Sequence, residues 1–386
     1  MYRSTPRLPR TVWLLVIARA FNRLGAFSMS FLTVLISTDF GAGAATAGLV
    51  AAAFGLATIP SRLIGGLLAD RLGRRHTIML GLGGCALAQL GIAASGSLAA
   101  VTVCAVLLGL AFELYEPPSQ AMIADAVPPP SRVRAYSLLN VALAVGGLGA
   151  GLLASVLGRW DLRWLFVADA VTCALCAAVV GAALPADRPV RTPRGGEAGG
   201  PWRDPALLAM LAFGTAYALV RMQVVMSLPL SLEGRGLQPA DAGLLFAVEA
   251  VAAVAAQPLL RLRRAATLSA PASLAAGCLL LAAGLAGYAA AGGLMSYALA
   301  TVVCALGDVL VMGRVFAVVA DLSPAGAAGR YLAAYGVSWG VATVVAPVLG
   351  TQMLEHAGVA ALWAGMAGVC VLLAALVLLL LPTPGG

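Results

Sequence analysis

The sequence predicts an all-α membrane protein with twelve transmembrane helices. Of its 386 residues, 61% are hydrophobic and only 10% are charged, whereas soluble domains carry about 25% charged residues. The mean hydropathy is +0.96. Apolar runs of about 20 residues, the length at which a helix crosses a bilayer, recur along the whole chain. These properties argue against a soluble protein, and they favour helices over a β-barrel.

Each predicted span ends where charged residues, glycine or proline interrupt an apolar run. The first span follows three arginines and begins like a signal peptide, but it is too long and contains Arg19 and Arg23. We therefore expect an uncleaved helix there. The fourth span contains Pro117-Pro118, which should break or kink its helix. The predicted spans are 12–36, 46–69, 77–95, 98–124, 135–157, 164–184, 206–231, 242–260, 267–290, 294–319, 331–354 and 358–381.

The arginines predict the orientation of these spans. All 24 strongly basic residues are arginine, because the sequence contains no lysine. With the N-terminus inside, sixteen arginines fall in cytoplasmic segments, three in outer loops and five within spans. The positive-inside rule then places both termini in the cytoplasm. The basic residues follow membrane topology, so no nucleic-acid partner is expected.

The missing lysine and the few histidines exclude several kinds of site. Without lysine there is no Walker A loop and no Schiff base to retinal or pyridoxal phosphate. The two histidines, His76 and His356, lie near loops, so a zinc site or a histidine-based hydrolase is not expected. We expect a protein that is not an enzyme and that needs no cofactor or metal.

The spans divide into two halves of six. The one long connection, 185–205, is rich in proline, glycine and arginine and predicts a cytoplasmic linker between 1–184 and 206–386. An Ala-Asp pair ending at Asp125, with a proline and an arginine after it, recurs 196 residues later at Asp321. Such a repeat suggests duplication of a six-helix bundle.

One motif between the second and third spans resembles a known family. It reads Gly66-Leu67-Leu68-Ala69-Asp70-Arg71-Leu72-Gly73-Arg74-Arg75. This resembles the G-x-L-a-D-r-x-G-r-r/k signature of the major facilitator superfamily, and the twelve spans in two similar halves extend the resemblance over the whole chain. The resemblance implies two bundles that rock about a midplane site to give alternating access.

The resemblance also implies a cytoplasmic gate at this motif. Gly66 allows close approach of two helices, and Asp70 suits the positive end of a helix from the other half. Arg71, Arg74 and Arg75, with Gly73 between them, would then pair across the two bundles and latch the outward-facing state. The alternative is that these arginines only set the membrane topology.

The chain departs from the drug exporters of this family at two places. Those exporters usually carry an arginine in the fourth span, where this chain has Glu113 and Glu116 and no arginine. They also usually carry Gly-Pro-x-x-Gly-Gly in the fifth span. Here Gly147 and Gly151 are present, but Leu152 stands at the proline position.

Ten ionisable residues fall inside the predicted spans. A charge at the centre of a membrane helix costs about 2.5–3.5 kcal/mol on insertion scales, so these groups should pair or line a water-filled cavity. Seven of them lie on spans one, four, seven and ten, which line the central cavity in the family. Of the ten, Asp169, Arg62 and Arg314 are expected nearer to an interface. The ten are Arg19, Arg23, Arg62, Arg221, Arg314, Glu113, Glu116, Asp169, Glu249 and Asp308.

Glu113 and Glu116 are the first candidates for handling a proton. They are three residues apart and would share one helix face, so that repulsion in a low dielectric favours proton uptake by one of them. The alternative is a static salt bridge to Arg19 or Arg23 that only joins two helices. Glu249 and Asp308 are further candidates. The predicted substrate cavity comprises Arg19, Asn22, Arg23, Phe112, Tyr115, Arg221, Gln223, Arg314, Tyr335 and Trp339.

The sequence therefore predicts a proton-coupled exporter of a small amphipathic compound in a bacterial inner membrane. Its partners would be the small-molecule substrate, protons and the lipid bilayer, and we expect a monomer. Two alternatives on the same fold remain: an importer of an anionic metabolite that uses Arg19, Arg23 and Arg221, and a lipid or lysolipid transporter. A receptor or scaffold without transport would not need charges on four cavity helices.

Overall fold

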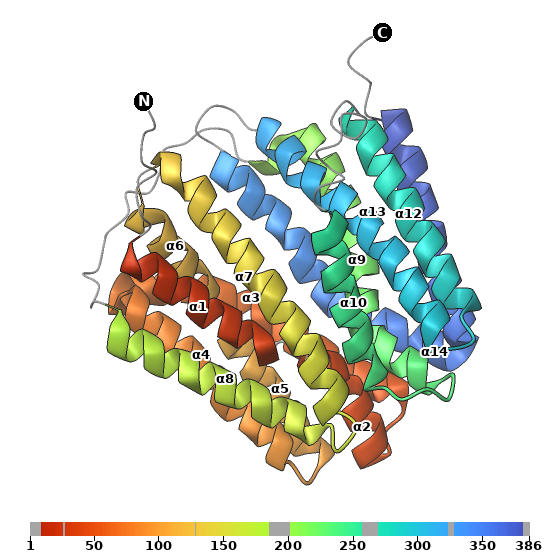
Figure 1. The fold of residues 1–386 in the computed structure, drawn as a ribbon, viewed down its shortest axis with the longest axis horizontal. Coiled ribbons are helices and arrows are strands. Elements are labelled where there is room, and N and C mark those ends of the chain that lie inside the picture. The colour runs from red at the N-terminus through yellow and green to blue at the C-terminus, as the bar shows by residue number, and fades with distance from the viewer. Residues whose placement is uncertain are drawn as a thin grey trace. The chain divides into compact units, whose positions relative to one another are not determined.

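A computed structural model describes residues 9–25, 28–127, 129–184, 201–256, 269–322 and 328–380. Within these ranges the chain is helical and contains no strand (Figure 1). The helices are α1 (Arg10–Gly25), η1 (Ser28–Phe31), α2 (Leu32–Phe40), α3 (Ala44–Leu72), α4 (Arg74–Ala94), α5 (Leu98–Phe112), α6 (Glu116–Ala126), α7 (Pro129–Leu157), α8 (Arg163–Ala183), η2 (Pro201–Arg203), α9 (Pro205–Glu233), α10 (Asp241–Ala256), α12 (Ala270–Ala290), α13 (Leu294–Asp321) and α14 (Ala328–Leu380).

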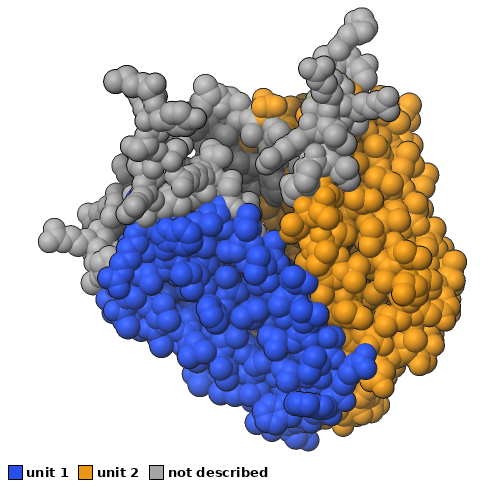
Figure 2. Space-filling model, viewed as in Figure 1, with its two compact units in different colours: residues 1–28, 53–193 blue, residues 29–52, 194–386 orange. Residues whose placement is uncertain are grey.

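The helices gather into two compact units (Figure 2). Unit 1 comprises residues 1–28 and 53–193, and unit 2 comprises 29–52 and 194–386. The segment 29–52, which holds α2 and the first residues of α3, therefore packs with helices from the other end of the chain. Most of the predicted linker, 185–205, lies outside the described residues, and the division into the halves 1–184 and 206–386 stays a prediction.

In unit 1, α4 packs against α8 and α5, and α1 packs against α7 and α8. Glycines allow close contacts between these helices. A β-carbon on Gly146 of α7 would lie 2.5 Å from the carbonyl oxygen of Ala20 in α1, and one on Gly109 would lie 2.8 Å from the β-carbon of Ala57. Small residues at helix contacts are typical of membrane bundles, because backbones can then approach closely.

In unit 2, α9 packs along α14, and α12 packs against both α13 and α14. The buried aromatic rings of this unit include a cluster around Tyr288. The centroid of its ring lies 5.3 Å from that of Tyr297 and 5.2 Å from that of Trp363. The Tyr288 hydroxyl shares a hydrogen bond of 2.7 Å with Thr301, so its polar end is satisfied where the ring is buried.

Eight helices in the described part of the chain are long and apolar enough to cross a membrane. Large apolar side chains such as Leu87 and Leu379 are 74% and 79% exposed, which suits a surface solvated by lipid rather than water. The eight run over Arg10–Phe40, Ala44–Ala69, Arg74–Ala94, Arg163–Ala183, Pro205–Glu233, Ala270–Ala290, Leu294–Met312 and Ala334–Leu379. Two shorter apolar helices, Leu98–Phe112 and Val141–Leu157, accompany them.

Four predicted spans differ in detail from the helices observed. The first span, 12–36, contains α1, η1 and α2, and residues 26–27 between α1 and η1 lie outside the described part of the chain. The fourth, 98–124, is divided at residues 113–115, where α5 ends and α6 begins with Pro117 in its first turn. This break confirms the effect predicted for Pro117-Pro118. The eleventh and twelfth spans correspond to the two helices of α14, which meet at a kink where Gly358 has non-helical angles, with φ 83° and ψ 172°.

Candidate functional site

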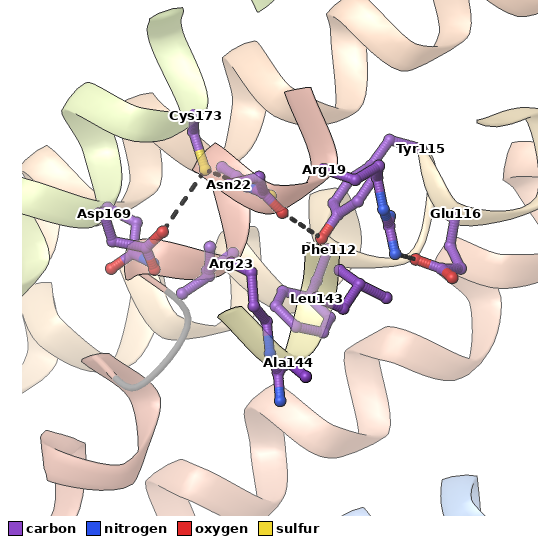
Figure 3. Close-up of a pocket in the computed structure, with 13 residues that line it drawn as sticks. Arg19, Asn22, Arg23, Phe112, Tyr115, Glu116, Leu143, Ala144, Asp169 and Cys173 are labelled. Carbon is purple, nitrogen blue, oxygen red and sulfur yellow. Dashed lines mark hydrogen bonds and ion pairs between the residues drawn. The ribbon is translucent and has the colours of Figure 1, made fainter. Parts of the chain in front are cut away.

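A cavity of about 470 Å³ lies within unit 1, between α1, α4, the junction of α5 and α6, α7 and α8 (Figure 3). One part of its wall is apolar and the other is strongly polar. A half-polar wall of this kind suits a ligand that has both an apolar body and a charged or hydrogen-bonding group. The apolar part includes Leu108, Phe112, Leu143 and Ala144, and the polar part includes Arg19, Asn22, Arg23, Gln89, Glu116 and Asp169.

Arg19 joins the helices on one side of this cavity. Its Nη2 atom lies 2.5 Å from an oxygen of Glu116, and its guanidinium lies over the Tyr115 ring, 5.1 Å from the centroid. The Tyr115 hydroxyl in turn donates to Asn22 Oδ1 at 3.1 Å, and Asn22 Nδ2 donates to the sulfur of Cys173 at 3.2 Å. These contacts connect α1, α6 and α8 and hold the predicted cavity residues in place.

The break between α5 and α6 separates the two glutamates that were expected to act together. Glu113 follows the end of α5 and Glu116 begins α6, so the two carboxylates lie on either side of the break rather than on one uninterrupted helix. Glu113 pairs with Arg62 at 3.2 Å, whereas Glu116 pairs with Arg19. Each carboxylate thus has an arginine of its own, which favours the static salt bridge over a shared proton for this pair.

Asp169 is a cavity residue that the sequence reasoning missed. It was expected near a membrane interface, yet it is only 5% exposed and lines the cavity. Its Oδ2 atom accepts hydrogen bonds from the Ser28 hydroxyl at 2.7 Å and from Gln89 Nε2. The sulfur of Cys173 lies 3.6 Å from Oδ1. A polar Gln89 in the middle of the apolar run 77–95 was the signal available in the sequence.

Unit 2 contains a second charged cluster, made of residues from three helices. Arg221 on α9 pairs with Glu249 on α10 through Nη2, and its Nε lies 3.0 Å from Asp308 Oδ1 on α13. The Tyr217 hydroxyl also donates to Asp308. The Arg221, Glu249 and Asp308 side chains are 12%, 16% and 22% exposed. One guanidinium therefore faces two carboxylates inside the bundle.

The remaining predicted cavity residues occupy different environments. Gln223 is fully buried: it donates to the carbonyl of Ala346 at 2.8 Å and accepts from Ser227 at 2.6 Å, so it joins α9 to α14. Trp339 packs edge-on against Tyr217, with centroids 6.2 Å apart. Tyr335 is buried with its ring against Gly214. Arg314 is half-buried on α13, and Arg23 lines the cavity from α1. The ring of Phe112 packs edge-on against that of Phe54, with centroids 5.5 Å apart.

The motif between the second and third spans ends α3 and begins α4. Gly73 is the N-cap of α4 and has φ 90° and ψ 155°, which an L-residue with a side chain rarely adopts. Arg75 donates to the carbonyl of Gly181 near the end of α8, while Arg71 is exposed. Arg74 is half-buried. The surroundings of Gly66 and Asp70 in α3 lie outside the described residues.

Comparison with known proteins yields one family and several partial relatives. A family model described as the Major Facilitator Superfamily matches residues 15–337. A multidrug resistance protein MdtH of Cronobacter sakazakii is 30% identical over 191 residues, which is 49% of this chain and 48% of that protein. An uncharacterised transporter YqjV of this superfamily from Bacillus subtilis is 29% identical over 160 residues, covering 41% and 39%. The matches span about half the length of these curated relatives or less.

Solved structures share the fold over almost the whole chain. A crystal structure of a variant of the peptide transporter POT covers 96% of this chain and 94% of its own, with a TM-score of 0.82 at 16% identity. The crystal structure of a D-xylose-proton symporter covers 96% and 97%, with a TM-score of 0.76 at 14% identity. At such identities the likeness establishes the arrangement of helices and nothing about the substrate.

Proposed function

The chain belongs to the major facilitator superfamily, and we propose that it is a proton-coupled exporter of small amphipathic compounds. It is a multi-pass membrane transporter and not an enzyme. In this proposal twelve spans form two bundles in a bacterial plasma membrane, both termini are cytoplasmic, and the 66–75 motif forms the cytoplasmic gate. Transport follows alternating access by a monomer.

The observation that carries proton coupling is the cluster around Arg221. One positive charge faces the two carboxylates of Glu249 and Asp308, so the three groups carry a net negative charge while both carboxylates are ionised. In a low dielectric this excess favours uptake of one proton by the cluster as a whole. By contrast, Glu113 and Glu116 each have a separate arginine, so we move the proton site from the fourth span to this cluster.

The cavity of unit 1 supports the choice of an amphipathic substrate. Its volume of about 470 Å³ and its mixture of apolar and charged walls suit a small compound with one charged group. The direction of transport rests on the likeness to multidrug resistance proteins, which covers 49% of the chain at 30% identity. Substrate identity and direction are thus parts of the proposal that transport measurements must decide.

The test is transport of a lipophilic fluorescent cation, ethidium, into proteoliposomes under an imposed pH gradient. We expect wild-type protein to drive ethidium against its gradient in exchange for protons. Variants Glu249→Gln and Asp308→Asn should lose this accumulation yet still allow ethidium to exchange down its own gradient. The matched control is Glu233→Gln, which neutralises an exposed carboxylate at the end of α9 and should behave as wild type.

Full pH-driven accumulation by the Glu249→Gln/Asp308→Asn double variant would refute a proton site at Arg221. Absence of any pH-driven flux in wild type, across several cationic and neutral compounds, would refute proton-coupled export.

A second candidate, import of an anionic metabolite, is favoured by one observation. The Nη1 atom of Arg19 is buried and has no hydrogen-bond partner among the described residues, and Arg19 lines the cavity. A carboxylate or phosphate of a substrate would satisfy this donor. Proteoliposomes that accumulate an organic anion but not ethidium would favour this candidate.

A further inference from the structure

Asp169 differs from the other carboxylate in the wall of the unit 1 cavity. Glu116 is neutralised by Arg19, whereas the partners that the structure gives Asp169 among the described residues are all neutral: Ser28, Gln89 and Cys173. Arg23 lines the same cavity, but its side chain extends away from Asp169 (Figure 3). An ionised carboxylate buried among neutral groups is strongly unfavourable, so this position calls for a bound cation or a proton.

Gln89 supplies a second acceptor at the same place. Its Nε2 donates to Asp169 and to the Ser28 hydroxyl, which fixes the orientation of the amide. As a result its Oε1 atom is buried and has no hydrogen-bond partner among the described residues. Buried acceptors are rarely left without a donor. The side chain is 1% exposed and lines the cavity, so a donor on a ligand in the cavity would satisfy it.

We propose that Asp169 and Gln89 together bind the protonated amine of the transported compound. Two acceptors, one charged and one neutral, suit an ammonium group that keeps its N–H bonds. A quaternary ammonium group has no N–H to donate and would leave Gln89 Oε1 unsatisfied. The apolar body of the compound would pack on Leu108, Phe112 and Leu143. This inference rests on the proposed transport function, and within that function it predicts a preference for amphipathic primary and secondary amines over quaternary cations.

The same arrangement makes binding depend on pH, because a proton on Asp169 excludes the ammonium group. Several other charged or titratable groups face this site. Arg19 and Arg23 extend from α1, Cys85 from α4, and Cys173 and Cys176 from α8 itself. Tyr115 and Glu116 complete the wall at the α5–α6 junction. The side chains that the structure describes on α7 include no titratable group. The arginines are charged over the whole range of the test, so they do not produce such a dependence.

The test is calorimetric titration of the purified full chain in detergent with three probes that share one skeleton. These are 4-phenylbutylammonium, its N,N,N-trimethyl analogue and 4-phenylbutanoate. We expect wild type to bind the primary ammonium at least about tenfold more tightly than the trimethyl analogue. Its affinity should fall as the pH is lowered from about 8 to about 5, because burial of Asp169 favours the protonated form of its carboxyl group. The variant Asp169→Asn should lose about tenfold in affinity together with this pH dependence, while Asp161→Asn, an exposed control just before α8, should match wild type.

Three results would overturn the proposal: equal binding of the two ammonium probes, tighter binding of the anion, or unchanged binding by Asp169→Asn. If Asp169→Asn does not fold, the variant Gln89→Met tests the proposal instead. It keeps the Asp169 carboxylate but removes the Oε1 acceptor, so it should lose the preference for the primary ammonium over the trimethyl analogue. Retention of that preference would overturn the proposal as well. Binding in detergent involves no membrane or proton gradient. A failure of proton-driven export would therefore leave this result standing, and a failure here would leave coupling at Arg221 untouched.

Discussion

Gly48 at the start of α3 lies directly against Thr351 of α14, and no side chain fits between them. A β-carbon on Gly48 would meet the Thr351 hydroxyl and would lie 2.8 Å from the carbonyl oxygen of Pro347. One turn earlier, the backbone N–H of Ala45 donates to Glu355 at 3.0 Å. These contacts hold the segment 29–52 in unit 2.

Gly48→Ala should therefore loosen this segment. Forcing a methyl group into the contact costs about 1–3 kcal/mol, because the opposing atoms include backbone that cannot move aside. We expect a lower melting temperature and faster hydrogen exchange in residues 44–52. Gly43→Ala is the control, since its β-carbon would have only Glu355 as a neighbour, at 3.9 Å. Exchange unchanged by Gly48→Ala would contradict the contact.

Gly73→Ala should destabilise the turn between α3 and α4. Its φ of 90° and ψ of 155° lie in a region open almost only to glycine, so strain of about 1–3 kcal/mol is expected. Gly83→Ala, nine residues from the start of α4 and with open space around it, should instead stabilise the helix by about 0.5–1 kcal/mol. Thermal unfolding of both variants in detergent checks the opposite signs. A shift in the same direction would argue against backbone strain at Gly73.

Arg221→Met should be one of the most damaging single substitutions in unit 2. It leaves Glu249 and Asp308 buried without their cation, and the loss of one partner of a buried ion pair costs about 3–5 kcal/mol. Adding Glu249→Gln and Asp308→Asn removes the uncompensated charges, so the triple variant should recover much of the stability. Melting temperatures of the single and triple variants give the comparison. A triple variant less stable than Arg221→Met would show that the charges are not the cause.

Tyr331→Phe should lower stability in a way that depends on pH. The Tyr331 hydroxyl donates to Asp204 Oδ2 at 2.9 Å, and this hydrogen bond holds the pKa of the Asp204 carboxyl below its ordinary value. A lowered pKa in the folded state stabilises the fold at pH values above the unfolded pKa, and this contribution is lost as the pH falls through the folded pKa.

The difference in melting temperature between wild type and Tyr331→Phe should thus be present at neutral pH and shrink in acid. Asp204 is half-buried at the start of α9, and partial solvent screening keeps the effect small. Melting curves between about pH 7 and pH 3 check this. A difference that grows in acid would have the wrong sign.

Hydropathy correctly predicted an all-helical fold, because the bilayer imposes one length and one kind of side chain on every span. It predicted twelve spans, of which the described residues show eight helices long and apolar enough to cross a membrane. The break at residues 113–115 was also predictable, since Pro117 and Pro118 cannot continue the helix of α5. The partners that this break gives to Glu113 and Glu116 were not predictable. The expectation that Glu113 and Glu116 share a face assumed an uninterrupted helix, and the break directs them to Arg62 and Arg19 instead.

Asp169 shows a second limit of the sequence. Its position near one end of the span 164–184 suggested an interface. However, the groups that surround it, Ser28 and Gln89, come from segments 141 and 80 residues away. Which polar side chains meet across a bundle depends on the rotation and tilt of each helix, and apolar runs that are hydrophobic on all sides do not fix these. The partners of Arg221 on α10 and α13 were unpredictable for the same reason.

The geometry at Gly358 has a consequence for sequence change in this part of the chain. The two halves of α14 are joined through this residue alone, with φ 83° and ψ 172°, whereas most connections between helices are loops that tolerate length variation. An inserted or deleted residue at this kink would change the angle at which the second half of α14 leaves the first. Buried Trp363 and Cys370 in the second half would then be displaced from their packing. Single-residue insertions and deletions at this connection should accordingly lower the melting temperature more than those in an exposed loop.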